Sequence, residues 1–183
     1  MKNVYVVRHC QAEGQASDAP LTAAGVEQAD KLAEFLTDKH IEHIISSPYE
    51  RAYRTITPFA DQHGMAIALD DRLTERVLSG NNHPDWRDML RKTYDDSELC
   101  YEGGESSNTA MKRVSSVITE ALESGYNNVV IVSHGNLISL LLKHFDDRIG
   151  IKEWESLSNP DVYHLTFDKD APSSIEYGHN DGK

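Results

Sequence analysis

Short apolar runs alternate along this chain with longer stretches in which apolar residues recur every three or four positions. The first run is Val4 to Val7, a later one is Val129 to Val132, and both are rich in β-branched residues, which favour strands. The longer stretches have the spacing of helices that bury one face. Such alternation is typical of an α/β fold, and we expect a three-layer αβα sandwich with a mainly parallel central sheet.

Two of the expected helices have recognisable starts. Thr22 can cap a helix with an apolar face. That face consists of Val26, Ala29, Leu32, Ala33 and Leu36. After an expected strand at His43 to Ser46, the segment Ser47-Pro48-Tyr49-Glu50 has the composition of a capping box, with Ser47 as the N-cap. This start places Arg51 in the first helical turn, and Pro58 should kink or end the helix.

The rest of the chain is predicted in less detail. Met65 to Leu69 should form a third strand, whereas residues 70 to 104 are too long for an ordinary connection and should form a lid or substrate wall. A helix capped by Ser106 or Ser107 should follow. Late edge strands are expected at Val162 to Phe167 and Ser174 to Tyr177, with residues 178 to 183 frayed. We expect residues 1 to 183 to form one domain.

Composition limits the function classes. The 183 residues include 18 basic and 30 acidic side chains, so the formal charge is −12. This charge disfavours a nucleic-acid or anionic-membrane surface, so any anion site must be local. The apolar run Leu137 to Leu142 is far below the roughly 20 residues of a membrane span. Cys10 and Cys100 are too few for a disulfide framework, so we expect a cytoplasmic protein. The sequence specifies no oligomeric state.

Both apolar runs end at a histidine. Arg8-His9-Cys10 follows the first run, and Ser133-His134-Gly135 follows the later one. Ligands of α/β sheets bind where strands end. A histidine beside an arginine suits attack on a phosphate, because guanidinium binds phosphate oxygens in pairs and imidazole is a competent nucleophile. Arg8 would repel a dication, and no histidine pair has the spacing of a zinc helix, so no metal site is expected.

An ordered set of segments resembles the histidine phosphatase superfamily, the phosphoglycerate-mutase-like proteins. The segments are Arg8-His9, Pro20-Leu21-Thr22 with Gly25 and Gln28-Ala29, Ser46-Ser47-Pro48-Tyr49-Glu50-Arg51-Ala52 with Thr55, Leu73-Thr74-Glu75-Arg76, Gly103-Gly104-Glu105-Ser106, and Val132-Ser133-His134-Gly135. The resemblance covers roughly Val4 to Leu142. It implies that the sandwich has the phosphoglycerate-mutase-like fold.

The resemblance also implies a phosphohistidine mechanism without cofactor or metal, acting on a small phosphate ester. His9 would attack phosphorus, Arg8, Arg51 and His134 would bind the phosphoryl oxygens, and Glu75 would donate a proton to the leaving oxygen. Cationic groups around one phosphorus stabilise the charge on its oxygens, which is most of what phosphoryl transfer requires. His9 must be neutral to attack, whereas His134 would serve best protonated.

Two residues depart from the family pattern. Cys10 stands where the family usually has glycine, and we expect its thiol to be a spectator. Gln15 stands where members often carry a phosphate-contacting asparagine, and its longer amide could still reach. Cysteine-dependent phosphatase chemistry is excluded, because Ala16 and Ser106 occupy the positions where that mechanism needs an arginine after each cysteine.

We weigh three functions. The first is a phosphomonoesterase, and the second is a mutase that returns the phosphoryl group to the same substrate. Mutases of the family generally have a basic lid, but residues 76 to 102 hold four basic and six acidic side chains, which favours hydrolysis. The third is a non-catalytic module that binds phosphate or a phosphoprotein, which loss of His9 or Glu75 would indicate. Both residues are present, so we expect an enzyme.

Overall fold

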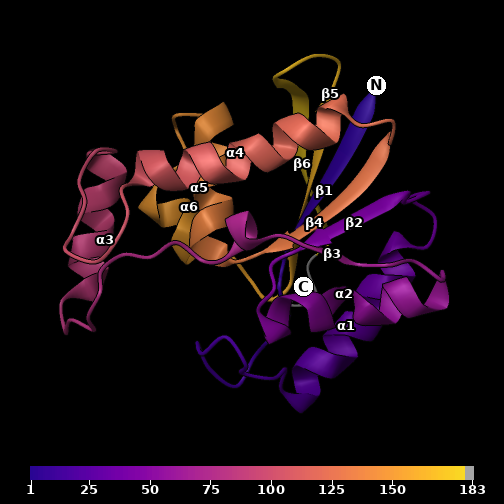
Figure 1. Ribbon diagram of the computed structural model, residues 1–183, viewed down its shortest axis with the longest axis horizontal. Coiled ribbons are helices and arrows are strands. Elements are labelled where there is room, and N and C mark those ends of the chain that lie inside the picture. Colours follow the sequence, from indigo (N-terminus) through magenta and orange to yellow (C-terminus); the bar gives the residue numbers. More distant parts are fainter. Residues whose placement is uncertain (180–183) are drawn as a thin grey trace.

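The computed structural model describes residues 1–179 and contains one sheet of six strands in the order β3-β2-β4-β1-β5-β6 (Figure 1). The strands are β1 (Lys2–Arg8), β2 (His43–Ser46), β3 (Ala68–Leu69), β4 (Asn128–Ser133), β5 (Asp161–Phe167) and β6 (Pro172–His179). β3, β2, β4 and β1 pair in parallel, and the last two strands are antiparallel. The mainly parallel sheet is thus confirmed.

Helices cover both faces of this sheet. The longer ones are α1 (Ala23–Leu36), α2 (Glu50–Gln62), α4 (Ser107–Glu123) and α5 (Gly135–Phe145). Figure 1 shows α1 and α2 on one side and α4 and α5 on the other. Because side chains alternate along a strand, Val4 and Val6 belong to the core beneath α4 and α5, whereas Tyr5 and Val7 belong to the core beneath α1 and α2. This arrangement confirms the three-layer αβα sandwich.

The helix starts differ in part from the prediction. Thr22 caps α1 as expected, accepting a hydrogen bond from the Gly25 N–H. Val26, however, is 53% exposed. Gly25 takes the inward position of the first turn, where an added Cβ would lie 2.1 Å from the Gln11 carbonyl oxygen. The buried stripe of α1 therefore begins at glycine, which a hydrophobic pattern cannot reveal.

The predicted capping box at Ser47 is wrong. Tyr49 is the N-cap of α2, and its side chain makes no capping hydrogen bond. The Ser47 N–H instead continues the sheet pairing to the Val132 carbonyl, and its hydroxyl contacts His134. Arg51 still lies in the first turn, as predicted, and the helix continues past Pro58 to Gln62.

The strand predictions need three corrections. β3 covers only Ala68–Leu69, because the expected residues before it form no ladder. β5 is not an edge strand, since it lies between β1 and β6. Residues 178 and 179 belong to β6 rather than to a frayed end, and residues 180 to 183 lie outside the described part.

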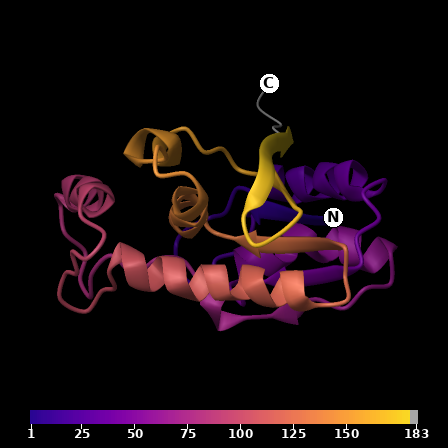
Figure 2. The ribbon, with the colours of Figure 1, turned by 90° about the horizontal axis from the view of Figure 1, so that it is seen from above.

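The segment between β3 and α4 forms the insert, which contains a short 3-10 helix (Asp71–Leu73) and α3 (Trp86–Asp95). Figures 1 and 2 both show α3 beyond the sheet, past one end of α4. At the base of the insert Gly103 has φ 75°, and a Cβ there would lie 2.6 Å from the Gly80 Cα. Glycine at this position therefore allows the two arms of the insert to touch. The helix that follows is capped by Ser106, one of the two predicted caps.

The two histidines meet through the sheet register. Arg8 of β1 is opposite Ser133 of β4, and the His9 N–H continues the ladder to the Ser133 carbonyl at 3.1 Å. The next residues on both strands are therefore neighbours at one edge of the sheet. None of the helices described over residues 1–179 is long and apolar enough to cross a membrane.

Candidate active site

His9 and His134 face each other at the ends of β1 and β4. Their ring centroids are 5.1 Å apart and the rings are inclined by 63°. His9 is 8% exposed and His134 is fully buried. Arg8, Arg51 and Glu75 lie around them, so the structure brings together the residues that the sequence predicts for the site.

Hydrogen bonds fix which nitrogen of His9 carries the proton. Nδ1 lies 2.8 Å from the Cys10 carbonyl oxygen, which can only accept, so Nδ1 is the donor. Nε2 accepts from Nε of Arg51 at 3.3 Å. The Nε2 lone pair therefore points to the side where Arg51 would hold an anion. Burial above all, with the charges of Arg51 and Arg8, lowers the pKa of His9 to about 4, although the hydrogen bond to the Cys10 carbonyl acts in the opposite direction. His9 is neutral at physiological pH, as a nucleophile must be.

Arg51 connects Nε2 of His9 to the loop that contains Gln15 and Ala16. It is 1% exposed, and Nη1 donates to the carbonyl oxygens of Gln15 at 3.2 Å and Ala16 at 2.8 Å. Burial lowers the pKa of Arg51, and the Glu75 carboxylate opposes that effect. The Gln15 carbonyl thus holds Arg51, and Gln15 lines the same cavity as Arg51, whereas the contact of its side-chain amide with phosphate stays a prediction.

Arg8 approaches the pair of histidines from the end of β1. Its Nη1 donates to the Leu157 carbonyl at 3.0 Å, and its buried Nε has no partner among the described residues. A Cβ at position 135 would lie 2.9 Å from that Nε, so Gly135 leaves the guanidinium its space. An unsatisfied buried donor is costly in a folded protein and is typical of a binding group whose ligand is an anion.

His134 is the N-cap residue of α5. Its Nε2 lies 2.8 Å from the Ser47 hydroxyl oxygen, and its buried Nδ1 has no partner among the described residues. Burial lowers the pKa of His134 well below its usual range, and His9, Arg51 and Arg8 lower it further. This low pKa favours the neutral ring in the free protein, and the protonated ring expected during binding of the phosphoryl group stays a prediction. A dianion in the pocket would oppose the charges that depress this pKa.

Glu75 lies where the insert meets α5. Its Oε1 accepts from the backbone N–H groups of Arg76 at 2.8 Å and Leu137 at 2.9 Å, and its Oε2 accepts from that of Asn136 at 3.1 Å. Arg113 supports this segment from α4, since Nη2 donates to the Glu75 carbonyl at 3.2 Å. The first turn of α5 thus holds the carboxylate in a fixed place beside the histidines.

Several site residues were missed at the sequence level. Ser47 contacts His134 through a hydroxyl that the capping motif had assigned to a helix start. Asn159 donates from Nδ2 to the His9 carbonyl at 2.8 Å, although the two residues are 150 positions apart in the sequence. The Tyr49 ring centroid lies 5.1 Å from that of His134. Of these, Ser47 and Tyr49 lie within the Ser46 to Ala52 segment, whereas nothing local indicates Asn159.

Cys10 does not compete with His9. Its side chain is fully buried, and its N–H donates to the Thr55 hydroxyl at 2.8 Å. The sulfur therefore offers no surface to a substrate, in agreement with a spectator role. Over the described residues, no group of three or more histidine, cysteine, aspartate or glutamate side chains could hold a metal ion.

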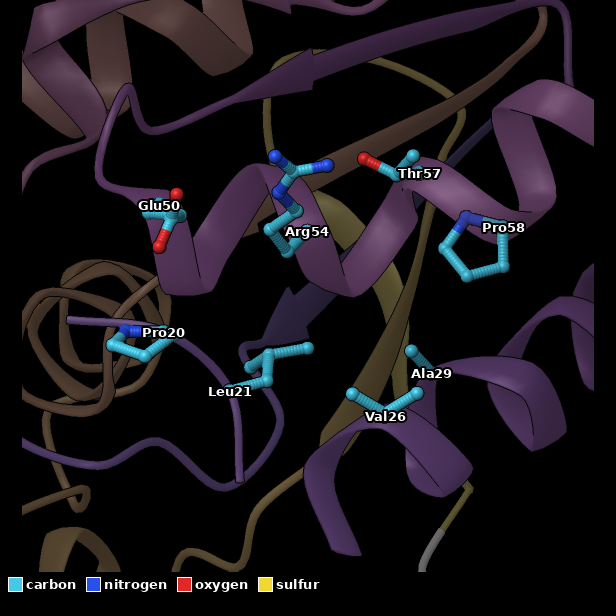
Figure 3. Close-up of a pocket in the computed structure, with 8 residues that line it drawn as sticks. All are labelled: Pro20, Leu21, Val26, Ala29, Glu50, Arg54, Thr57 and Pro58. Carbon is cyan, nitrogen blue, oxygen red and sulfur yellow. The ribbon is translucent and has the colours of Figure 1, made fainter. Parts of the chain in front are cut away.

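Two cavities differ sharply in their lining. One, of about 310 Å³, contains Arg51, Glu75 and Gln15 together with residues of the insert. The other, of about 420 Å³, lies between α1 and α2 and is mostly apolar (Figure 3). Its lining is Pro20, Leu21, Val26, Ala29, Glu50, Arg54, Thr57 and Pro58. It includes none of the predicted site residues, whereas the first cavity is lined by three of them, Gln15, Arg51 and Glu75, but not by Arg8, His9 or His134. The first cavity therefore adjoins the pair of histidines.

The buried histidines should make stability depend on pH. Between pH 6.5 and about 4, unfolded His9 binds a proton that the folded site excludes, so the free energy of unfolding should fall as the pH falls through this window. The His9 contribution is roughly 3 kcal/mol over the whole window. Urea unfolding at pH 7.5 and 5 should show a larger loss in the wild type than in His9→Gln. Equal losses in the two proteins would contradict the assignment.

Comparisons with known proteins agree with this geometry. The family model of the histidine phosphatase superfamily (branch 1) matches residues 4–180. A candidate phosphoserine phosphatase of Hydrogenobacter thermophilus is 30% identical over 158 residues, 78% of this chain and 77% of that protein. A candidate phosphoglycerate mutase of Salmonella paratyphi A, GpmB, is 30% identical over 172 residues, 84% of this chain and 78% of that protein. A mycobacterial glucosyl-3-phosphoglycerate phosphatase with inorganic phosphate has a TM-score of 0.75 at 26% identity, over 97% of this chain and 94% of that chain.

Proposed function

Because this chain belongs to the histidine phosphatase superfamily, branch 1, we propose that it hydrolyses a small phosphate monoester through a phosphohistidine on His9. The observation that carries the proposal is the state of His9, whose Nδ1–H is held by the Cys10 carbonyl while Nε2 faces Arg51. We treat residues 1 to 183 as one phosphatase domain, with the insert at about 70 to 104 as its lid.

The reaction proceeds in two steps. The Nε2 lone pair of His9 attacks phosphorus, the bond from phosphorus to the ester oxygen breaks, and Glu75 gives that oxygen a proton. Water then attacks the phosphohistidine, the P–N bond breaks, and Glu75 takes up a proton from the water. The charge on the phosphoryl oxygens is met throughout by Arg8, Arg51 and His134, which need no metal ion for this purpose.

The unpartnered nitrogens support this distribution of roles. Besides Arg76 Nε in the insert, two buried side-chain nitrogens have no partner among the described residues, Arg8 Nε and His134 Nδ1. Both belong to side chains that surround His9, where the phosphoryl group would lie. A phosphate would supply the missing oxygen atoms to Arg8, and Arg51 could add a contact without leaving Gln15 and Ala16.

Hydrolysis is favoured over mutase chemistry by the state of the cations in the insert. Arg91 and Lys92 pair with Asp88, and Arg87 lies 3.8 Å from Glu155. Arg76 is buried and donates to the Thr93 hydroxyl and the Glu105 carbonyl. These are the only basic side chains between 76 and 102, and of them only Arg76, whose buried Nε has no partner among the described residues, lines the active-site cavity. One such cation is little to retain a phosphorylated acid between two transfers.

The proposal is tested by turnover of p-nitrophenyl phosphate at mildly acidic to neutral pH, with chelator and without added metal. We expect release of inorganic phosphate under both conditions. Folded protein without turnover would contradict the enzyme and favour a non-catalytic phosphate-binding module. Conversion of 3-phosphoglycerate to 2-phosphoglycerate faster than phosphate release would favour the mutase.

Glu75→Gln should separate substrates by their leaving groups. An alkyl phosphate needs a proton on its poor leaving group, so its kcat should fall by roughly 10²-fold or more, whereas p-nitrophenyl phosphate should lose much less. Asp71→Asn, which removes an exposed carboxylate nearby, serves as the matched control and should change neither rate. Equal losses for the two esters in Glu75→Gln would argue against a proton donor.

A further inference from the structure

The main chain that carries Glu75 is held from α4. Residues 75 to 79 belong to no helix or strand, and the segment before them, with the 3-10 helix, runs beside α4 (Figure 1). Three carbonyl oxygens of this segment accept hydrogen bonds from one guanidinium, that of Arg113. Its Nη1 donates to the Arg72 carbonyl at 2.7 Å and the Thr74 carbonyl at 2.8 Å, and its Nη2 donates to the Glu75 carbonyl at 3.2 Å. One side chain thus fixes the main chain of the residue proposed as the proton donor.

Glu105 fixes the direction of this guanidinium. Arg113 Nε donates to Glu105 Oε1 at 2.8 Å and Nη2 donates to Glu105 Oε2 at 3.3 Å, and the two side chains are only 19% and 17% exposed. The Glu105 N–H also donates to the Val77 carbonyl at 2.8 Å. The ion pair therefore ties the two arms of the insert together at its base, because one arm carries Glu75 and the other carries Glu105.

Arg113 has no donor left for a ligand. A guanidinium carries five N–H groups. Those of Arg113 make five hydrogen bonds, three to the main-chain carbonyls and two to Glu105. Arg113 also does not line the cavity that contains Arg51 and Glu75. Any effect of Arg113 on the reaction must therefore pass through the groups that it holds.

Glu75 is thus held from two sides. The N–H groups of Asn136 and Leu137 hold its carboxylate oxygens from α5, and Arg113 holds its main chain from α4. A proton donor must come within about 2.6–3.2 Å of the oxygen that it protonates. A displacement of ~1 Å can lower a rate by roughly 10²-fold. Loss of either hold should therefore weaken proton transfer without removing the carboxyl group.

We propose that Arg113 is a positioning residue for proton transfer. It holds Glu75 in the place from which the carboxyl group reaches the ester oxygen, and Glu105 anchors it there. The proposal rests on the phosphatase activity proposed above and adds to it a residue outside the active-site cavity. Loss of Arg113 should act as a partial loss of Glu75, and only when Glu75 is present.

The test compares Arg113→Gln with the wild type on phenyl phosphate and p-nitrophenyl phosphate, which differ only in the nitro group. Their kcat/KM reports the transfer to His9, the step in which Glu75 gives the proton. Arg113→Gln should lower kcat/KM for phenyl phosphate, which has the poorer leaving group, by about tenfold, and leave that for p-nitrophenyl phosphate within about twofold. In the Glu75→Gln background, Arg113→Gln should change neither value by more than about twofold, because the group that it positions is gone.

Two further variants separate positioning from folding and from charge. Arg113→Gln leaves Glu105 as a largely buried carboxylate without its cation, which costs stability. The double variant Arg113→Gln/Glu105→Gln removes that charge as well, and it should show the same discrimination between the two esters. Lys112→Gln removes an exposed cation from the neighbouring position of α4, and it should change neither value. Circular dichroism should show that the variants are folded.

Each outcome decides a different claim. Equal losses for the two esters in either folded Arg113 variant, or no loss for phenyl phosphate, overturn the positioning role. A tenfold loss that persists in the Glu75→Gln background overturns it as well, since Arg113 would then act through another group. A wild type that hydrolyses neither ester overturns the proposed phosphatase itself.

Discussion

His9→Ala is expected to abolish turnover, with a loss in kcat of roughly 10³-fold or more, because it removes the atom that accepts the phosphoryl group. The neighbouring groups cannot replace it. His134 Nε2 is engaged with Ser47, and the Cys10 side chain is fully buried. The loss should be similar for p-nitrophenyl phosphate and for an alkyl phosphate, since both esters require the same nucleophile.

The control for this result is His63→Ala, which removes an exposed histidine at the end of α2. It should retain wild-type kcat. Circular dichroism and binding of vanadate, a phosphate analogue, should show that His9→Ala still folds around the remaining anion-binding groups. A His9→Ala protein that keeps a tenth or more of the wild-type rate would contradict the nucleophile.

Arg51→Ala is expected to have the next largest effect, a fall in kcat/KM of about 10²- to 10³-fold. It removes a charge that faces His9 Nε2 at 3.3 Å and also releases the carbonyls of Gln15 and Ala16. Arg51→Lys should recover little. The planar guanidinium can donate to the histidine, the loop and a phosphate at the same time, whereas a single ammonium cannot reach all three.

Arg54→Ala is the matched control on the same helix. Arg54 lies one turn further along, is exposed and lines the apolar cavity of Figure 3 rather than the active site. Its removal should leave kcat/KM within about twofold. Equal losses in Arg51→Ala and Arg54→Ala would indicate a general effect of charge on the helix and would contradict direct binding of the phosphoryl group.

Much of the scaffold could be predicted because it follows local rules. The β-branched runs form β1 and β4, Thr22 caps α1, which follows β1, and Ser106 caps α4, which precedes β4. Parallel pairing then makes His9 and His134 neighbours without further information. The ordered motifs added Arg51 and Glu75, which periodicity alone could not have connected to the histidines.

The failures arise where tertiary contacts override local preference. Ser47 lies in a segment with the sequence of a helix N-cap, but its hydroxyl forms a hydrogen bond with His134 instead. Gly25 rather than Val26 faces the interior, because a carbonyl of a distant loop lies against it. The low pKa of His134 depends first on its burial and then on His9 and the arginines packed around it, and this combination exists only after folding.

The insert shows the same limit more strongly. Its helix α3 packs on α6 (Ile151–Glu155), which comes much later in the chain. The contact of Trp86 with Trp154 joins residues too far apart in the sequence for a local pattern to predict. Tyr94, which the sequence could place only as an aromatic of the insert, is buried and bonds the Ser139 hydroxyl of α5 at 2.5 Å. It therefore anchors α3 to α5 and does not line the cavity.

The central claim is that the phosphoryl group passes through His9, and it is tested most directly by trapping that intermediate. Wild-type protein mixed briefly with ³²P-labelled substrate and quenched in alkali should retain label that is stable to alkali and labile to acid, and peptide mapping should place it on His9. His9→Ala should retain none. Label that survives in His9→Ala, or that maps to another residue of the wild type, would contradict the account.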